Sequence, residues 1–178
     1  PWSPETHPRR CRPVLGSRTS ADVIISDSAS LRTLFLPYFF GARNEMSFLA
    51  CFDGKLKLLG VRLLSEGSPS ANEISLRKIA TEALALGATA VVLAHNHPSG
   101  NAAASQNDIV ATRQVEMALE SIDATLNDHI IFAGDDYHSF AKSGWLWTAK
   151  REVRRQRQEE LQASREEERE ILRRGGLL

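Results

Sequence analysis

The chain has 178 residues, enough for one compact domain with a sizeable core, and its 22 lysines and arginines are balanced by 22 aspartates and glutamates. This zero net charge provides no field that would draw the chain to nucleic acid or to an anionic membrane surface, and no apolar run is long enough to span a bilayer. Two isolated cysteines, Cys11 and Cys51, exclude a disulfide framework, and without a secretory signal we expect a cytoplasmic protein.

Residues 1–20 form a leader rich in proline, arginine and serine, which we expect to be disordered or loosely packed because its apolar residues have no period. A helix is predicted next, with a cap near Asp27 and an end near Gly41. Its inward residues recur at helical spacing and are Leu31, Leu34 and Phe35. The predicted domain therefore begins at residue 21.

Two apolar strands are predicted at 46–52 and 55–64. They are separated by Asp53-Gly54, a strong signal for a tight hairpin, so the two strands should be antiparallel neighbours. Ser75 can cap a second helix that ends near Gly87. The residues on its inward face are Leu76, Ile79, Ala80, Ala83 and Leu84.

A short apolar strand at 90–94 leads into the sequence His-Asn-His-Pro-Ser-Gly, which begins at His95. Residues two apart on a strand point to the same side, so His95 and His97 can present their rings to one point. A helix beginning at Ser105 carries Asp108 on the same inward face as its apolar residues. Two histidines and a carboxylate form the ligand set of a catalytic zinc that keeps its fourth position for water, and we predict a zinc site here.

Ser105 and Asp108 have a second interpretation, because Ser-x-x-Asp also fits a helix capping box that serves the helix alone. The coincidence of two histidines, a turn built on Pro98 and Gly100, and an inward-facing aspartate favours metal binding. Ser105 can be both a cap and a site residue.

The remaining elements are a strand at 125–132, a turn at 133–136 and a short closing strand at 137–140. His129 and His138 are expected to be structural, with the alternative that His129 supports a metal ligand from behind. From residue 149 the composition becomes highly charged, which predicts a helical tail at 149–178 after a domain at 21–148. This tail either protrudes as a solvated helix or binds a partner or a second copy of the chain.

The pattern His-x-His-Pro-x-Gly followed by Ser-x-x-Asp resembles the metal-binding motif of the JAMM (also JAB or MPN+) metalloproteases, and the RadC-like branch most closely. In that branch the block reads His-Asn-His-Pro-Ser-Gly, an Asp-His-hydrophobic strand follows, and a Ser-Phe-x-x-x-Gly segment closes the domain. The matching residues here begin at His95, Asp128 and Ser139. The resemblance covers residues 31–146, with one departure at 76–78, where Leu-Arg-Lys replaces the usual Pro-Arg-Glu.

Alternating helices and strands predict a layered α/β domain, and the resemblance implies a mixed β-sheet flanked by helices on both faces in a cytidine-deaminase-like architecture. It also implies a zinc-dependent hydrolase that cleaves a peptide or isopeptide bond through a metal-activated water. By resemblance, Glu45 at the entry of an early strand is the general base, with Glu66 and Glu73 as alternatives. Ser105 would donate a hydrogen bond to the oxyanion.

A rival function belongs to another class. RadC-like proteins carry a DNA-repair label, and longer members place a helix-hairpin-helix DNA-binding domain before this one. The residues that precede Glu45 are too few for that domain, so nucleic-acid binding is the less favoured expectation. The alternative is a non-catalytic, DNA-repair-associated or partner-binding adaptor on a metal-binding fold, for which salt-sensitive DNA binding would be the sign.

Overall fold

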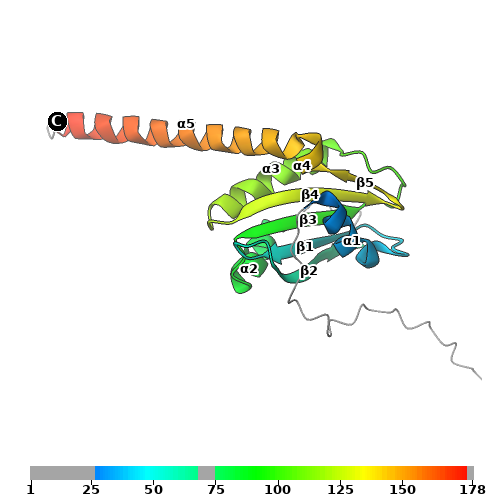
Figure 1. The fold of residues 1–178 in the computed structure, drawn as a ribbon. Helices are drawn as coiled ribbons and strands as arrows, with labels where there is room; N and C mark the ends of the chain where they lie inside the picture. The colour runs from blue at the N-terminus through cyan, green and yellow to red at the C-terminus, as the bar shows by residue number, and fades with distance from the viewer. Residues whose placement is uncertain (1–26, 68–74, 176–178) are drawn as a thin grey trace, which may run out of the picture.

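The structure is a computed structural model that describes residues 27–67 and 75–175, so the predicted leader, Cys11 and Glu73 lie outside the described residues (Figure 1). Its helices are α1 (Ser28–Phe39), α2 (Leu76–Ala85), α3 (Gln106–Glu120), α4 (Phe140–Ser143) and α5 (Trp145–Arg174). Its strands are β1 (Met46–Phe52), β2 (Leu58–Glu66), β3 (Ala90–Asn96), β4 (Thr125–Ala133) and β5 (Asp136–Ser139).

The strands form one mixed sheet in the order β2-β1-β3-β4-β5. β1 pairs antiparallel with both β2 and β3, whereas β3 and β4 are parallel and are connected through α3. β3 is therefore the central strand, hydrogen bonded on both sides, and every one of its residues is buried. This position explains the nearly continuous apolar run that precedes His95.

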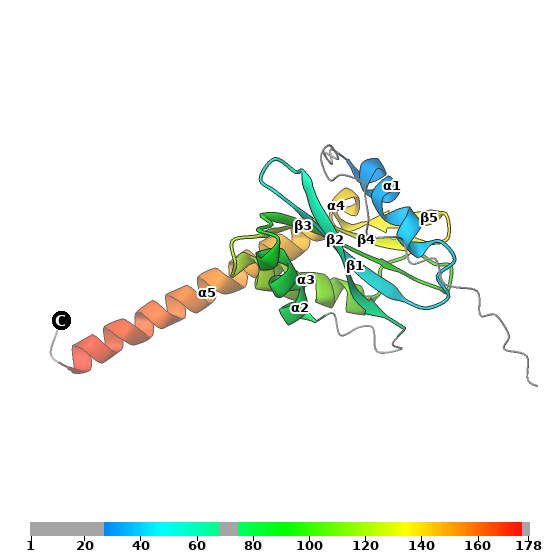
Figure 2. The same cartoon turned by 90° about the horizontal axis from the view of Figure 1, so that it is seen from below.

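Helices cover both faces of the sheet, as predicted (Figure 2). On one face α1 packs Leu31, Phe35 and Phe39 against strand residues that include Phe48 and Phe52. On the other face α2 and α3 pack against the intervening residues of the same strands. The members of this second layer include Leu49, Cys51, Ile79, Val91, Leu93, Val115 and Leu119. Alternate residues of β1 and β3 thus supply two separate cores.

β4 contains one residue more than its partner at Asn127, because Val91 lies opposite Leu126 and Val92 lies opposite Asp128. Such a bulge interrupts the alternation of side chains along the strand. Leu126 faces α3, and beyond the bulge it is the odd-numbered Ile131 that faces α3. His129, two residues before Ile131, therefore also lies on the α3 side of the sheet.

The β1–β2 hairpin is antiparallel as predicted, and its turn begins at Asp53, whose carbonyl accepts the N–H of Leu56 at 3.0 Å, but the connection is longer than the two residues expected. The carboxylate of Asp53 accepts the backbone N–H groups of Lys55 at 2.8 Å and Lys57 at 2.9 Å. Leu56 adopts a left-handed backbone conformation, with φ of 60°. The side chain of Asp53 thereby stabilises a longer loop, and β2 begins at Leu58 rather than at residue 55.

The charged C-terminal segment is helical, and α5 begins at Trp145, ahead of the change in composition at Ala149. Leu146, Ala149 and Val153 of α5 are buried, and Glu152 forms a 2.6 Å ion pair with Arg113 of α3. The rest of α5 projects from the domain (Figure 1). In the part of the chain that the structure describes, no helix is both long and apolar enough to cross a membrane.

Candidate metal centre

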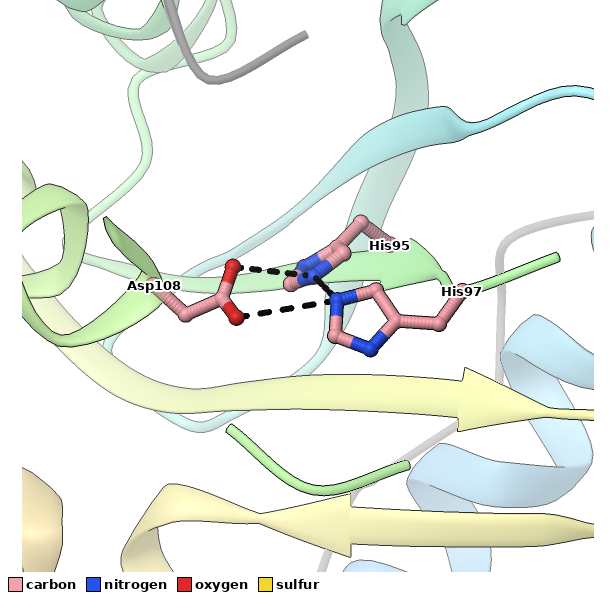
Figure 3. Close-up of side chains that lie close together, drawn as sticks. All are labelled: His95, His97 and Asp108. Carbon is pink, nitrogen blue, oxygen red and sulfur yellow. Dashed lines mark hydrogen bonds and ion pairs between the residues drawn. The ribbon is translucent and has the colours of Figure 1, made fainter. Parts of the chain in front are cut away.

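His95, His97 and Asp108 come together where β3 ends and α3 begins (Figure 3). His95 is the next-to-last residue of β3, and His97 directly follows the strand. Asp108 lies in the first turn of α3. One ligand atom from each residue lies within 4.8 Å of the other two. The His95 and Asp108 side chains are buried, whereas that of His97 is 16% exposed, so the site opens to solvent beside His97.

Two of the separations between candidate ligand atoms, those of His95 Nε2 from His97 Nε2 and from Asp108 Oδ1, lie close to those of a tetrahedral ion, and the second histidine is nearer to the other carboxylate oxygen. His95 Nε2 lies 3.0 Å from His97 Nε2 and 3.2 Å from Asp108 Oδ1. His97 Nε2 lies 3.6 Å from Asp108 Oδ2. A tetrahedral zinc ion with bonds of about 2.0–2.1 Å holds its ligand atoms about 3.3–3.4 Å apart. The three residues present therefore suit a zinc ion in both chemistry and spacing.

The hydrogen bond behind His97 fixes which of its nitrogens can bind a cation. His97 Nδ1 lies 2.9 Å from the carbonyl oxygen of Asn101, which can only accept, so Nδ1 carries the proton. A neutral His97 then presents a lone pair at Nε2, toward the carboxylate of Asp108. Nε2 of His97 and the carboxylate of Asp108 are then both acceptors. Their repulsion is relieved by a metal ion bound between them or by a proton donated from a neighbouring ring.

Ser105 holds the carboxylate of Asp108 in place. Its backbone N–H and its hydroxyl donate to Asp108 Oδ2 at 2.7 Å and 2.6 Å, and the hydroxyl accepts the N–H of Asp108 at 3.2 Å. The predicted capping box is therefore present. Burial raises the pKa of Asp108, but the hydrogen bond and charge of His95, with the hydrogen bonds from Ser105, outweigh it and hold this pKa well below its usual range. Asp108 is thus ionised, and Oδ1 is the oxygen that Ser105 leaves available.

His129 supports His95 from behind, in agreement with the alternative drawn from the sequence. His129 Nε2 lies 2.9 Å from His95 Nδ1, and His129 Nδ1 lies 2.7 Å from Thr112 Oγ1. Burial, followed by the charge of His95, lowers the pKa of His129 well below its ordinary value. His138 hydrogen bonds instead with Ser143 at 3.2 Å. Thr112 was not predicted from the sequence, although it lies one helical turn after Asp108.

Asp128, the neighbour of His129, has a structural role. Its carboxylate accepts the hydroxyl of Ser139 at 2.6 Å and the backbone N–H groups of His129 at 2.8 Å and Ala141 at 2.9 Å. Burial raises the pKa of Asp128, and these hydrogen bonds oppose the rise. Asp128 thus ties β4 to the closing segment, where Phe140 stacks on the ring of His129 at 4.8 Å.

Glu45 precedes β1 and is half-buried. Ser47 lies opposite His95 in the antiparallel ladder, and continuing this register by two residues would bring Glu45 opposite His97. The amide of Asn96 accepts the N–H of Met46 at 2.8 Å and donates to the carbonyl of Asn44 at 3.1 Å. The residue between the two histidines therefore holds the backbone on both sides of Glu45, a role that the sequence did not reveal.

Comparison with known proteins identifies a matching family model and several similar bacterial proteins. A family model described as the RadC-like JAB domain matches residues 25–145. A UPF0758 protein of Bordetella bronchiseptica is 46% identical over 94 residues, which cover 53% of this chain and 42% of that protein. A UPF0758 protein of Neisseria meningitidis serogroup C is 31% identical over 136 residues, 76% of this chain and 60% of that protein. The UPF0758 protein YfjY of Escherichia coli is 36% identical over 106 residues, 60% of this chain and 66% of that protein. The chain thus spans only part of the length of these relatives, and none of the three names states an activity.

Proposed function

Because the chain belongs to the RadC-like JAB domain family, we propose that it is a zinc-dependent hydrolase that cleaves a peptide or isopeptide bond through a metal-activated water. The observation that carries this proposal is the convergence of His95, His97 and Asp108, with one ligand atom of each within 4.8 Å of the other two. His95, His97 and Asp108 would hold the zinc ion, whose chemistry would be to lower the pKa of a bound water toward about 7 and so supply a nucleophile at neutral pH.

We assign the general base to Glu45, which would take a proton from the attacking water and hand it to the leaving amine. The strand register, which continued by two residues brings Glu45 opposite His97, and the clamp formed by Asn96 support this role. Glu66, the alternative base within the described residues, lies opposite Met46 on β2 and so shares the face of Met46 rather than that of Ser47 and His95, which favours Glu45.

We assign to Ser105 the hydrogen bond that stabilises the oxyanion of the attacked carbonyl. Its hydroxyl lies at the metal centre, where it donates to Asp108 Oδ2 at 2.6 Å. To act on the substrate, Ser105 must redirect this proton as negative charge develops on the carbonyl oxygen. The backbone N–H of Ser105, 2.7 Å from the same Oδ2, continues to hold Asp108 when the hydroxyl turns away.

The substrate would be a peptide or a protein, and the activity would take place in the cytoplasm, where the buried thiol of Cys51 stays reduced. The projecting part of α5 would be a solvated helix, with binding of a partner or of a second copy of the chain as the alternative. The rival function, an adaptor that binds metal without turnover, differs in one measurable respect: it would retain the metal and cleave nothing.

The experiment begins with the metal content of the purified chain, for which we expect about one zinc per chain. His97→Ala should abolish stoichiometric zinc. A screen of peptide libraries should then show cleavage that a chelator stops. Full zinc occupancy in His97→Ala would contradict the assigned ligands, and zinc without any cleavage would favour the adaptor.

A matched pair of variants tests the base. Glu45→Gln keeps the shape of the side chain but cannot accept a proton, so it should retain zinc and lose turnover. Glu66→Gln, in the neighbouring strand, is the control and should keep both. Hydrolysis by Glu45→Gln at the wild-type rate would move the base to Glu66 or to Glu73.

A further inference from the structure

A chain of hydrogen bonds links His95 to the main chain of α3 through two side chains. His95 Nδ1 lies 2.9 Å from His129 Nε2, and His129 Nδ1 lies 2.7 Å from Thr112 Oγ1. The hydroxyl of Thr112 donates to the carbonyl oxygen of Asp108 at 2.6 Å. Thr112 and His129 are both fully buried, so solvent does not offer these groups other partners.

We call this chain of hydrogen bonds from His95 through His129 and Thr112 the relay. Once His95 binds a metal ion, the chemistry of each group decides which partner donates and which accepts in every hydrogen bond of the relay. A neutral imidazole that binds through Nε2 carries its proton on Nδ1, so His95 donates and His129 Nε2 accepts. Neutral His129 then carries its proton on Nδ1 and donates to the hydroxyl of Thr112. Thr112 passes its own proton to the carbonyl of Asp108, which can only accept. Every proton has an acceptor, and the relay ends at a main-chain oxygen.

Both histidines of the site therefore carry a proton on Nδ1 and leave Nε2 free for the metal ion, but different hydrogen-bond partners fix this tautomer. His97, at the end of the strand, donates directly to the carbonyl of Asn101. His95 faces the interior of the domain, where His129 and Thr112 connect it to a carbonyl on the neighbouring helix. That carbonyl belongs to Asp108, the third ligand, so the relay also ties His95 to the backbone of α3.

We propose that Thr112 and His129 are positioning residues that select the metal-binding tautomer of His95 and thereby raise the affinity of the site for zinc. This inference rests on the proposed metal centre but concerns the binding of the ion, whatever reaction follows. Partners that hydrogen bond to a metal ligand typically change metal affinity by about 10–100-fold when they are removed.

The first test compares the zinc affinity of the full chain, by competition with a chelator, in the wild type, Thr112→Val and Thr112→Ser. Valine matches threonine in shape but offers no acceptor to His129, so the dissociation constant for zinc should rise. The rise should be smaller than the change of about 10–100-fold expected for loss of His129 itself, which contacts the ligand directly. Serine keeps the hydroxyl and should restore the affinity. Equal affinities in the valine variant and the wild type would overturn the proposal.

A second pair keeps the test decisive if Thr112→Val does not fold. His129→Gln keeps an oxygen that can accept from His95 and an N–H that can donate to Thr112, whereas His129→Leu keeps neither. The glutamine variant should bind zinc more tightly than the leucine variant. Equal affinities in these two variants would also overturn the proposal.

Nitrogen-15 NMR of the zinc-loaded wild type reads the relay directly. Both His95 and His129 should carry their protons on Nδ1, and a proton on His129 Nε2 would overturn the proposed direction. Hydrolysis is not part of either readout. Zinc binding without cleavage would therefore refute the proposed function and leave the relay intact, whereas a chain that binds no zinc would overturn both.

Discussion

The packing of α5 on α3 predicts the effect of shortening the chain. Truncation after Thr148 removes Ala149 and Val153, which are 5% and 3% exposed. Burial of a valine side chain contributes about 1.5–3 kcal/mol, and that of an alanine methyl about 0.8 kcal/mol. The truncation also removes three ion pairs to α3, each worth about 0.2–1 kcal/mol because they are partly exposed. These pairs are Arg113–Glu152, Glu116–Lys150 and Glu120–Arg157.

After the cost of ordering these side chains is subtracted, the net loss is about 3 kcal/mol of unfolding free energy. In a domain of this size that loss lowers Tm by roughly 10 °C. The domain should still unfold in one cooperative transition, since both cores of the sheet remain. Thermal unfolding followed by circular dichroism measures the shift.

Truncation after Ala163 provides the matched control. It removes the end of α5 but keeps every contact with α3, so Tm should change by no more than about 2 °C. Equal melting temperatures for the full chain and the chain that ends at Thr148 would refute the packing argument. The part of α5 beyond Thr148 would then contribute nothing to the stability of the domain.

Three further predictions concern single side chains. Ser105→Ala should lower the free energy of unfolding by about 1 kcal/mol in chemical denaturation. Its turnover should stay at least about a hundredfold below that of the wild type even in zinc-saturated protein. Full recovery of the rate at saturating zinc would mean that Ser105 only orients Asp108. Asn96→Ala should retain zinc but reduce turnover by about 10–100-fold, because the backbone on both sides of Glu45 loses its hydrogen bonds to Asn96. Loss of zinc from this variant would instead show that Asn96 holds the metal ligands in place. Asp128→Ala should cost about 2–4 kcal/mol of unfolding free energy in urea, because the buried N–H of His129, the part-buried N–H of Ala141 and the buried hydroxyl of Ser139 lose their acceptor. An unchanged unfolding midpoint would contradict the structural role.

The sequence revealed the residues whose relation is local. His95 and His97 are two apart on one strand, and Ser105 and Asp108 are three apart at a helix start, so spacing alone predicted that each pair acts together. Asn96 and Thr112 escaped notice because their partners lie on other elements, and only the strand register and the packing of α3 bring them together.

Two other features depend on details that simple patterns do not contain. In a strand with strictly alternating side chains, Asp128 rather than His129 would share the α3 side of the sheet with Leu126. The extra residue at Asn127 shifts the alternation by one position, so His129 lies on that side instead. The Asp53-Gly54 pair predicted the hairpin correctly but not its length, because the carboxylate of Asp53 favours a longer connection by accepting two backbone N–H groups. Side-chain hydrogen bonds of this kind are decided by geometry rather than by residue type.

The bulge at Asn127 also marks a place where the length of the chain can vary. Leu126 already lies opposite Val91 and Asp128 opposite Val92, so removal of the exposed Asn127 would join two stretches that are each correctly paired. No residue of β4 would change its partner or its face of the sheet. An evolutionary deletion here would spare His129, whereas the loss of a residue between Asp128 and Ile131 would shift the residues beyond it to the opposite face.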